Sequence, residues 1–269
     1  MIKKLDRLFY KQFRELKTMK APGYMLDSLE EERRYYEHNK DRFAAALMDL
    51  TDEVDLKPGA KILDIGTSPL TFLLKEIYPD VSITTVDYDS KFRERCGKAG
   101  IEFWEVDLNS PKLMLLKRKY DAVLFLEVLE HLKLGPAHKR VVKVIIGSMK
   151  KSGICILQTP NKYSPKKIVT DSVFKIVWNY LSDVEEKGGV FVHHKEYSLN
   201  ELGKLIGSFH NVEVLKSTYQ MYFDTLASAL VYRKKSNLVR LILMINYYLV
   251  LNFPFLRRGM VIVFRKKSD

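Results

Sequence analysis

The stretch Lys61-Ile62-Leu63-Asp64-Ile65-Gly66-Thr67-Ser68-Pro69-Leu70 decides the fold of this 269-residue chain. Residues 62–65 are typical of a short buried strand, Gly66 breaks it, and the small residues 67–69 form a turn. An apolar run follows at 70–77 and predicts a helix. Open parallel α/β sheets build ligand sites from a strand, a tight turn and a helix. Because glycine lacks a Cβ, Gly66 lets the backbone approach a ligand closely.

Further strand-like runs follow, and two of them end in an acidic residue. The β-branched run 81–86 ends at Asp87, about 20 residues after Gly66, which is the spacing at which an acid meets a ribose hydroxyl. The run 101–106 ends at Asp107.

Two more strands complete the central pattern. The run 120–126 leads into Glu-Val-Leu-Glu-His-Leu (127–132), and the run 153–159 is ended by Pro-Asn. Helices are expected between the strands, so the alternation predicts a parallel sheet with right-handed crossovers. The expected helices span residues 70–78, 90–99, 110–117 and 127–150.

The series LDIG, VDYD, EVDLN, YDAVLFLEVLEHL and SGICILQTPN resembles the class I S-adenosylmethionine (SAM)-dependent methyltransferases over roughly residues 40–215. The LEVLEHL and TPN patterns are similar to those of enzymes that act on ubiquinone precursors, lipids and polysaccharides. The resemblance implies an α/β, Rossmann-like, seven-stranded and mostly parallel sheet, with an antiparallel last strand and helices on both faces. It also implies SAM as the cofactor.

The same resemblance implies a cofactor site. Asp64 and Gly66 would shape the SAM loop, Asp87 would hold the ribose hydroxyls, and Asp107 with Leu108 would frame the adenine. One departure is that the family's loop usually carries two or three glycines, whereas Ser68 and Leu70 stand at the later positions here. The full expected set of cofactor-binding residues is Asp64, Ile65, Gly66, Thr67, Ser68, Asp87, Tyr88, Asp107, Leu108 and Leu126.

Two histidines are the candidate catalytic residues. Methyl transfer from a sulfonium is an in-line displacement, in which the enzyme aligns the nucleophile and excludes water. An oxygen acceptor also needs its proton removed, so a base is expected. His131 lies just beyond the fourth strand, and His194 (or its neighbour His193) follows a predicted lid. The alternative for each is a polar residue at a helix end or in a loop.

A metal site is the other chemistry that this region suggests. Glu127, Glu130 and His131 are spaced i, i+3, i+4, so a helix would place them on one face, where they could hold a divalent metal. This E-x-x-E-H pattern is similar to that of ubiquinone-pathway O-methyltransferases and small-RNA 2′-O-methyltransferases. Metal-independent relatives also carry it, so no metal is predicted.

Two regions are predicted: an N-terminal helical extension or cap (1–56) and a methyltransferase domain (57–269). Residues 1–20 form a basic amphipathic helix, which either packs on the core or meets a membrane or partner. A second helix begins at the capping box of Ser28 and Glu31. Either Tyr35 or Tyr36 lines the SAM pocket, or both pack on the sheet.

Two insertions interrupt the second region: a lid-like segment at 162–192 and an apolar helical one at 236–258. Residues 238–256 approach the length of a membrane span, but Arg240, Asn246, Asn252 and Pro254 argue against one. We therefore expect a helix that lies on the domain or dips into a bilayer surface. A last strand follows at 260–264.

Charge and cysteine content indicate partners and location. The net charge of +12 suggests an acidic partner such as an anionic membrane surface, a nucleic acid or a phosphorylated substrate, unless it reflects lysine-rich composition. Cys96 and Cys155 read as free thiols in a reducing compartment, and the N-terminus does not read as a signal peptide. A cytoplasmic protein, peripheral on the membrane, is expected.

The function that these features favour is O-methylation of a small or lipid-linked acceptor, saccharide or quinone-like. The apolar stretch beside basic clusters motivates the lipid contact. An RNA methyltransferase and a non-catalytic SAM-fold binding protein are the alternatives. The sequence fixes neither the acceptor nor the oligomeric state.

Overall fold

The computed structural model describes residues 1–19, 23–24, 28–110, 119–133, 136–164, 194–220, 248 and 252–267. Most of the predicted 110–117 helix, of the 162–192 lid and of the 236–258 insertion therefore lies outside the described residues, as does His193.

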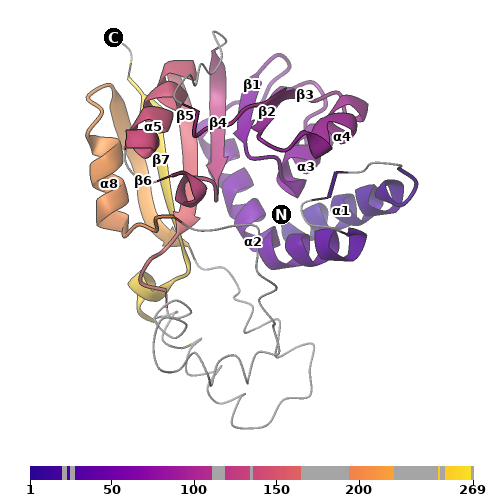
Figure 1. Ribbon diagram of the computed structural model, residues 1–269, viewed down its shortest axis with the longest axis horizontal. Helices are drawn as coiled ribbons and strands as arrows, with labels where there is room; N and C mark the ends of the chain where they lie inside the picture. The colour runs from indigo at the N-terminus through magenta and orange to yellow at the C-terminus, as the bar shows by residue number, and fades with distance from the viewer. Residues whose placement is uncertain are drawn as a thin grey trace.

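A seven-stranded sheet forms the centre of the molecule, in the order β3-β2-β1-β4-β5-β7-β6 (Figure 1). β7 is antiparallel to both of its neighbours, β5 and β6, and the other pairings are parallel. This confirms the predicted mostly parallel sheet with an antiparallel last strand. The strands are β1 (Lys61–Ile65), β2 (Ser82–Asp87), β3 (Glu102–Glu105), β4 (Tyr120–Leu126), β5 (Met149–Pro160), β6 (Val212–Gln220) and β7 (Gly259–Lys266).

The strand order reverses between β1 and β4. β1 pairs with β2 on one side and with β4 on the other, so the loops that follow β1 and β4 diverge from one point of the sheet. In open α/β sheets such a switch point, at the carboxyl ends of the strands, is where ligands bind.

Helices cover both faces of the sheet, as predicted (Figure 1). One buried cluster joins one face to the N-terminal helices, and a second joins the opposite face to α5 and α8. The helices are α1 (Ile2–Leu16), α2 (Leu29–Glu53), α3 (Pro69–Ile77), α4 (Arg93–Lys98), α5 (Pro136–Ser148) and α8 (Leu199–Gly207), with short 3₁₀ turns η1 (Ser90–Phe92), η2 (Leu129–His131) and η3 (Pro254–Leu256).

The basic helix α1 packs on α2, so the core-packing alternative for residues 1–20 is the one observed. Phe9 and Tyr36 stack with ring centroids 3.8 Å apart, and both side chains are fully buried. The Tyr36 hydroxyl donates a hydrogen bond of 3.0 Å to Asp6. Tyr36 therefore belongs to the contact between the two helices.

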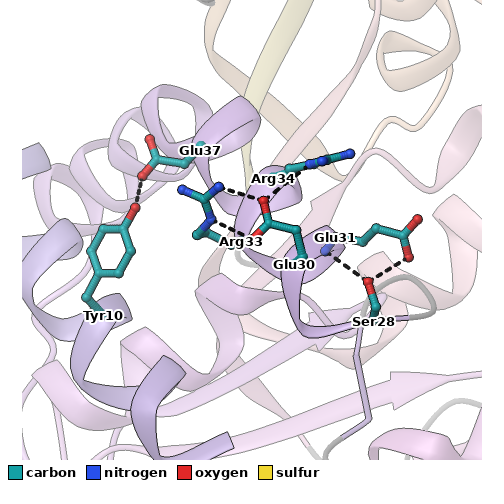
Figure 2. A network of polar contacts seen from close by, with 7 residues as sticks. All are labelled: Tyr10, Ser28, Glu30, Glu31, Arg33, Arg34 and Glu37. Carbon is teal, nitrogen blue, oxygen red and sulfur yellow. Dashed lines mark hydrogen bonds and ion pairs between the residues drawn. The ribbon is translucent and has the colours of Figure 1, made fainter. Parts of the chain in front are cut away.

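Polar contacts secure the start of α2 at the surface (Figure 2). The Ser28 hydroxyl accepts the Glu31 amide hydrogen bond at 3.2 Å, which confirms the predicted helix start. Arg33 donates to Glu30 at 2.6 Å, and the Tyr10 hydroxyl of α1 donates to Glu37. Most of these groups are partly exposed, so each contact adds little to stability, and of the three only the Tyr10–Glu37 bond joins α1 to α2.

The predicted helix at 127–150 is wrong in its first part. Glu127 has a left-handed backbone with φ of +56°, and its amide donates to the Gln158 carbonyl at 2.9 Å. A 3₁₀ turn follows, and the helix α5 starts only at Pro136. Because a left-handed residue cannot continue a helix, Glu127, Glu130 and His131 do not share a helical face.

Among the described helices, none is long and apolar enough to cross a membrane. Both cysteines are buried free thiols, as predicted.

Candidate active site at the carboxyl ends of the strands

Gly66 is the point where the loops after β1 and β4 touch. Its φ is +86°, a conformation that residues with a Cβ rarely adopt. A Cβ placed on Gly66 would lie 2.6 Å from Cγ2 of Val128. Both the backbone conformation and this contact therefore require glycine.

The later part of the loop is held by a helix cap in place of further glycines. The Ser68 hydroxyl accepts a hydrogen bond from the Leu70 amide at 3.2 Å, and Thr71 Oγ1 accepts one from the Ser68 amide at 2.9 Å. Pro69 takes the first helical position, where no amide donor is needed. Leu70 is buried in the first core. Ser68 and Leu70, which stand where the family usually has glycines, thus cap the start of α3 and pack it against the core.

Asp64 anchors this cap from β1. The Thr71 hydroxyl donates a hydrogen bond to the Asp64 carboxyl group, which is almost fully buried. Burial raises the pKa of Asp64 to about 7; the Thr71 hydrogen bond opposes the rise, and the Asp87 charge adds to it. Asp64 thus connects the strand to the start of α3.

Asp87 is joined directly to the Gly66 loop. The Thr67 amide donates to Asp87 Oδ2 at 2.8 Å, and the Asp89 amide donates to Oδ1 at 3.0 Å. Burial raises the pKa of Asp87, and these two amides oppose the rise. Each carboxylate oxygen keeps a second lone pair, so both oxygens of Asp87 can still accept hydrogen bonds from a ligand. The neighbouring Tyr88 side chain is exposed.

Asp107 and Leu108 lie just after β3, beside β2. The Val106 amide donates to the Asp87 carbonyl at 2.8 Å, which sets the two strand ends side by side. Asp107 is exposed, and Leu108 packs against the second core. The remaining predicted contacts are less accessible: Ile65 is fully buried in the second core and Leu126 is partly buried on the first.

Sequence analysis missed Arg42, which reaches the site from α2. Its guanidinium lies 3.0 Å from Glu127 Oε2, with only 7% of its side chain exposed, and it donates to the Tyr35 hydroxyl at 3.2 Å. The sequence signal was an arginine beside the apolar run 43–47 of a helix that covers the site.

Glu130 is fully buried at the end of β4. The Thr159 hydroxyl donates to its Oε2 at 3.0 Å. Burial raises the pKa of Glu130 well above its ordinary value, and the nearby Glu127 charge raises it further. Burial and the Glu127 charge therefore both favour the protonated form of the Glu130 carboxyl group.

Both candidate catalytic histidines adjoin Glu130. His131 Nε2 lies 3.9 Å from Glu130 Oε1, and the His194 amide donates to the Glu130 carbonyl at 2.8 Å. The structure thus brings together two residues that are far apart in the sequence. In the described part of the chain, no three His, Cys, Asp or Glu side chains are arranged to hold a metal.

A third histidine, His138, has a structural role. It is buried, its Nε2 donates to the Leu132 carbonyl at 3.0 Å, and its Nδ1 accepts from the Tyr197 hydroxyl. Burial lowers the pKa of His138, so it stays neutral. It fixes α5 to the segment that carries His194.

Comparison with known proteins gives the family. A family model described as a methyltransferase domain matches residues 29–209. No curated protein matches the chain significantly in sequence.

Solved structures share the fold at low identity. N-methyltransferase NodS from Bradyrhizobium japonicum WM9, in complex with S-adenosylhomocysteine (SAH), is 12% identical, with 97% of this chain and 99% of that chain covered and a TM-score of 0.50. The plantazolicin methyltransferase BpumL with SAH is 14% identical, covers 97% and 100%, and has a TM-score of 0.52. A SAM-dependent methyltransferase from Archaeoglobus fulgidus is 17% identical, covers 86% and 100%, and has a TM-score of 0.51.

The family match spans α2 through α8, and with it the Gly66 loop, Asp87 and the turn around Glu130. The chain belongs to the methyltransferase-domain family and is a class I SAM-dependent methyltransferase.

Proposed function

We propose that SAM binds across the ends of β1, β2 and β3, with Asp87 accepting hydrogen bonds from the ribose hydroxyls. The observation that carries this assignment is the hydrogen bond from the Thr67 amide to Asp87. It orients the carboxylate beside the Gly66 loop, at the carboxyl ends of β1 and β2. A carboxylate held in this way loses little conformational entropy when it accepts a ligand's hydroxyls.

The other proposed contacts with SAM follow from its position across the ends of β1, β2 and β3. Asp107 and Leu108 frame the adenine, and Tyr88 is exposed beside Asp87, where a ring can cover the nucleoside. Asp64, Ser68 and the buried Thr67 hold the loop. Calorimetric titration of SAH into the protein tests the site: we expect a micromolar dissociation constant, and loss of the heat in the Asp87→Ala variant.

We further propose O-methylation, with His131 as the general base. Bound SAM supplies a methyl group on a positively charged sulfur. His131 removes the acceptor hydroxyl proton as the oxygen attacks the methyl carbon and the carbon–sulfur bond breaks. Glu130 Oε1 lies 3.9 Å from Nε2 of this imidazole, and His194 borders the same turn. If His131 is this base, His131→Gln should lower kcat for methyl transfer by about a hundredfold or more and leave SAH binding unchanged.

A lipid-linked acceptor is supported by exposed aromatic rings at the same edge of the sheet. Phe253 is 44% exposed and Phe255 is 50% exposed, on and beside η3. The side-chain amide of Asn161, just after β5, donates hydrogen bonds to the Phe255 carbonyl at 2.7 Å and to the Arg257 carbonyl at 2.8 Å. These bonds fix the rings beside the proposed site, where a bilayer surface could deliver the acceptor.

Liposome sedimentation tests the lipid contact. We expect the protein to sediment with vesicles of phosphatidylglycerol and phosphatidylcholine, and the Phe253→Ser/Phe255→Ser variant to stay in solution. Met48→Ser, which removes an exposed apolar side chain from α2, is the control and should sediment like the wild type. If the wild-type protein does not sediment with anionic vesicles, the proposed lipid-linked acceptor is wrong, whereas the methyltransferase activity is unaffected by this result.

A further inference from the structure

Gln158 is a buried side-chain amide near the end of β5. In the part of the chain that the structure describes, neither its Oε1 nor its Nε2 has a hydrogen-bond partner. Leaving such groups unpaired costs about 1–3 kcal/mol, so buried polar groups of this kind call for a reason. An amide in the sheet, close to the proposed methyl-transfer site, is consistent with a group kept for a ligand.

The side chain of Gln158 projects to the face that α2 covers. Ile154 and Ile156 belong to the first core, and alternation along the strand puts Gln158 on the same face two residues later. Its cross-strand partner Val261 is in that core as well. On the other side Gln158 pairs with Leu126, the residue before Glu127.

Glu127 is the second incompletely paired group. Its Oε2 is bound to Arg42, but its Oε1 is buried and has no hydrogen-bond partner among the residues that the structure describes. Its left-handed backbone is uncommon for a non-glycine residue, and such conformations concentrate at functional sites. The Glu127 amide bonds to the Gln158 carbonyl, which holds the two residues together. Glu130 Oε1 is likewise buried and makes no hydrogen bond to the described residues.

We propose that Glu127 and Gln158 form the subsite that holds the methyl acceptor, and that this acceptor presents neighbouring hydroxyl groups, as a saccharide does. The inference rests on the SAM-dependent activity proposed above and names the substrate class of that same site. It adds specificity-determining residues that lie apart from the cofactor loop.

The hydrogen-bonding groups of Gln158 and Glu127 favour an acceptor molecule that carries hydroxyl groups. Gln158 offers two N–H donors and one oxygen, and Glu127 offers an oxygen that accepts. A hydroxyl both donates and accepts, so a pair of them satisfies the amide and the carboxylate together. An ammonium group only donates and would leave the Gln158 N–H groups unpaired, whereas the two hydroxyls of a 1,4-hydroquinone lie at opposite ends of the ring and cannot satisfy Gln158 and Glu127 together as neighbouring hydroxyls can. The Arg42 contact neutralises Glu127, which removes the attraction for a cationic amine.

Stability gives a readout that needs no acceptor. Gln158→Leu removes two unpaired polar atoms at similar volume, so we expect the melting temperature to rise by about 2 °C or more. The matched control is Gln12→Leu in α1, because the Gln12 Nε2 group donates to the Phe72 carbonyl at 3.2 Å and to Glu76 at 2.8 Å, so that only its Oε1 lacks a hydrogen bond among the described residues. That variant should melt at a lower temperature. A fall in melting temperature for Gln158→Leu would show that the amide is structural and would overturn the proposal.

Methyl transfer tests the substrate class. The full-length protein is incubated with tritium-labelled SAM and, separately, with n-octyl glucoside, n-octylamine or decylhydroquinone. We expect label in the glucoside, reduced at least about tenfold by Gln158→Leu and unchanged by Gln12→Leu. Absence of label from the glucoside overturns the proposal, whether or not the other two are labelled. SAH titration separates the failures: Gln158→Leu should bind SAH like the wild type, and a wild type that does not bind SAH refutes the cofactor site instead.

Discussion

Gly66 and Val128 touch at the point where the strand order of the sheet reverses, so that a Cβ on Gly66 would stand 2.6 Å from Cγ2 of Val128. One loop follows β1 and the other follows β4, and the contact fixes their separation. In a sheet of this topology, that separation sets the width of the ligand site.

Gly66→Ala should therefore abolish SAH binding and destabilise the protein. The left-handed backbone contributes about 1–2 kcal/mol, and the contact with Val128 adds to it. Gly59→Ala is the matched control, because Gly59 also has a positive φ, of +84°, but has no atom within 4 Å of its added Cβ. It should lower stability by the backbone contribution alone and leave SAH binding intact.

Adding Val128→Ala to Gly66→Ala should recover part of the lost stability, because it removes the methyl group that the new Cβ meets. Urea denaturation of the two single variants and the double variant measures the coupling. If the changes in unfolding free energy of the two single variants simply add up in the double variant, the contact between residues 66 and 128 does not cause the destabilisation.

The buried ion pair between Glu32 and Arg95 should fix α2 against α4. The two charged groups lie 2.9 Å apart with 0% and 5% of their side chains exposed, and the Arg95 guanidinium lies 3.8 Å from the centre of the Phe72 ring. Arg95→Leu removes the positive charge that lies beside the buried Glu32 carboxylate, so we expect a loss of about 3 kcal/mol. Glu32→Leu/Arg95→Leu should be more stable than Arg95→Leu alone, as measured by urea denaturation. A double variant less stable than the single one would contradict this.

Asp64 should make the protein less stable as the pH rises from 4 to 7. Burial raises its folded pKa to about 7 from an ordinary value of 3.8. In that window the folded state holds a proton that the unfolded state has lost, so the free energy of unfolding falls as the pH rises. Asp64→Asn keeps an acceptor for the Thr71 hydroxyl and should flatten the slope by up to about 1.4 kcal/mol per pH unit. Denaturation of both proteins at pH 4.5, 5.5 and 6.5 gives the difference; equal slopes would show that Asp64 is ionised throughout.

Asn161→Ala should release η3 from the end of β5. The side chain makes two hydrogen bonds to carbonyls of that segment, at 2.7 and 2.8 Å. Their loss should lower stability by about 2 kcal/mol and weaken sedimentation with anionic vesicles, because Phe255 is no longer held. If the variant is less stable but still sediments fully with the vesicles, the Asn161 hydrogen bonds are not needed for membrane binding.

The sheet and its loop could be predicted because their signals are local. A short apolar strand followed by Gly66, and a β-branched strand ending in Asp87, are each visible within ten residues. Alternation of strands with helices then fixed the parallel order. The predicted first part of the 127–150 helix was wrong because spacing alone cannot show that Glu127 adopts a left-handed backbone.

Long-range pairs could not be predicted. Four described strands lie between Arg42 and Glu127 along the chain, and no periodicity links the two residues. Gln158 looked like an ordinary polar residue near the end of a strand until its burial and lack of partners were known. Such pairs depend on how α2 packs across the sheet, which is a property of tertiary structure.

SAH affinity in wild type, Asp87→Asn and Asp89→Asn tests the cofactor site most directly. Asp87 lies at the end of β2 beside the Gly66 loop, whereas the neighbouring Asp89 carboxylate accepts the Lys91 amide at the start of η1. We predict a micromolar dissociation constant for the wild type, a loss of at least about thirtyfold in Asp87→Asn and little change in Asp89→Asn. Equal affinities for the wild type and Asp87→Asn, or no binding by the wild type, would contradict the proposed site.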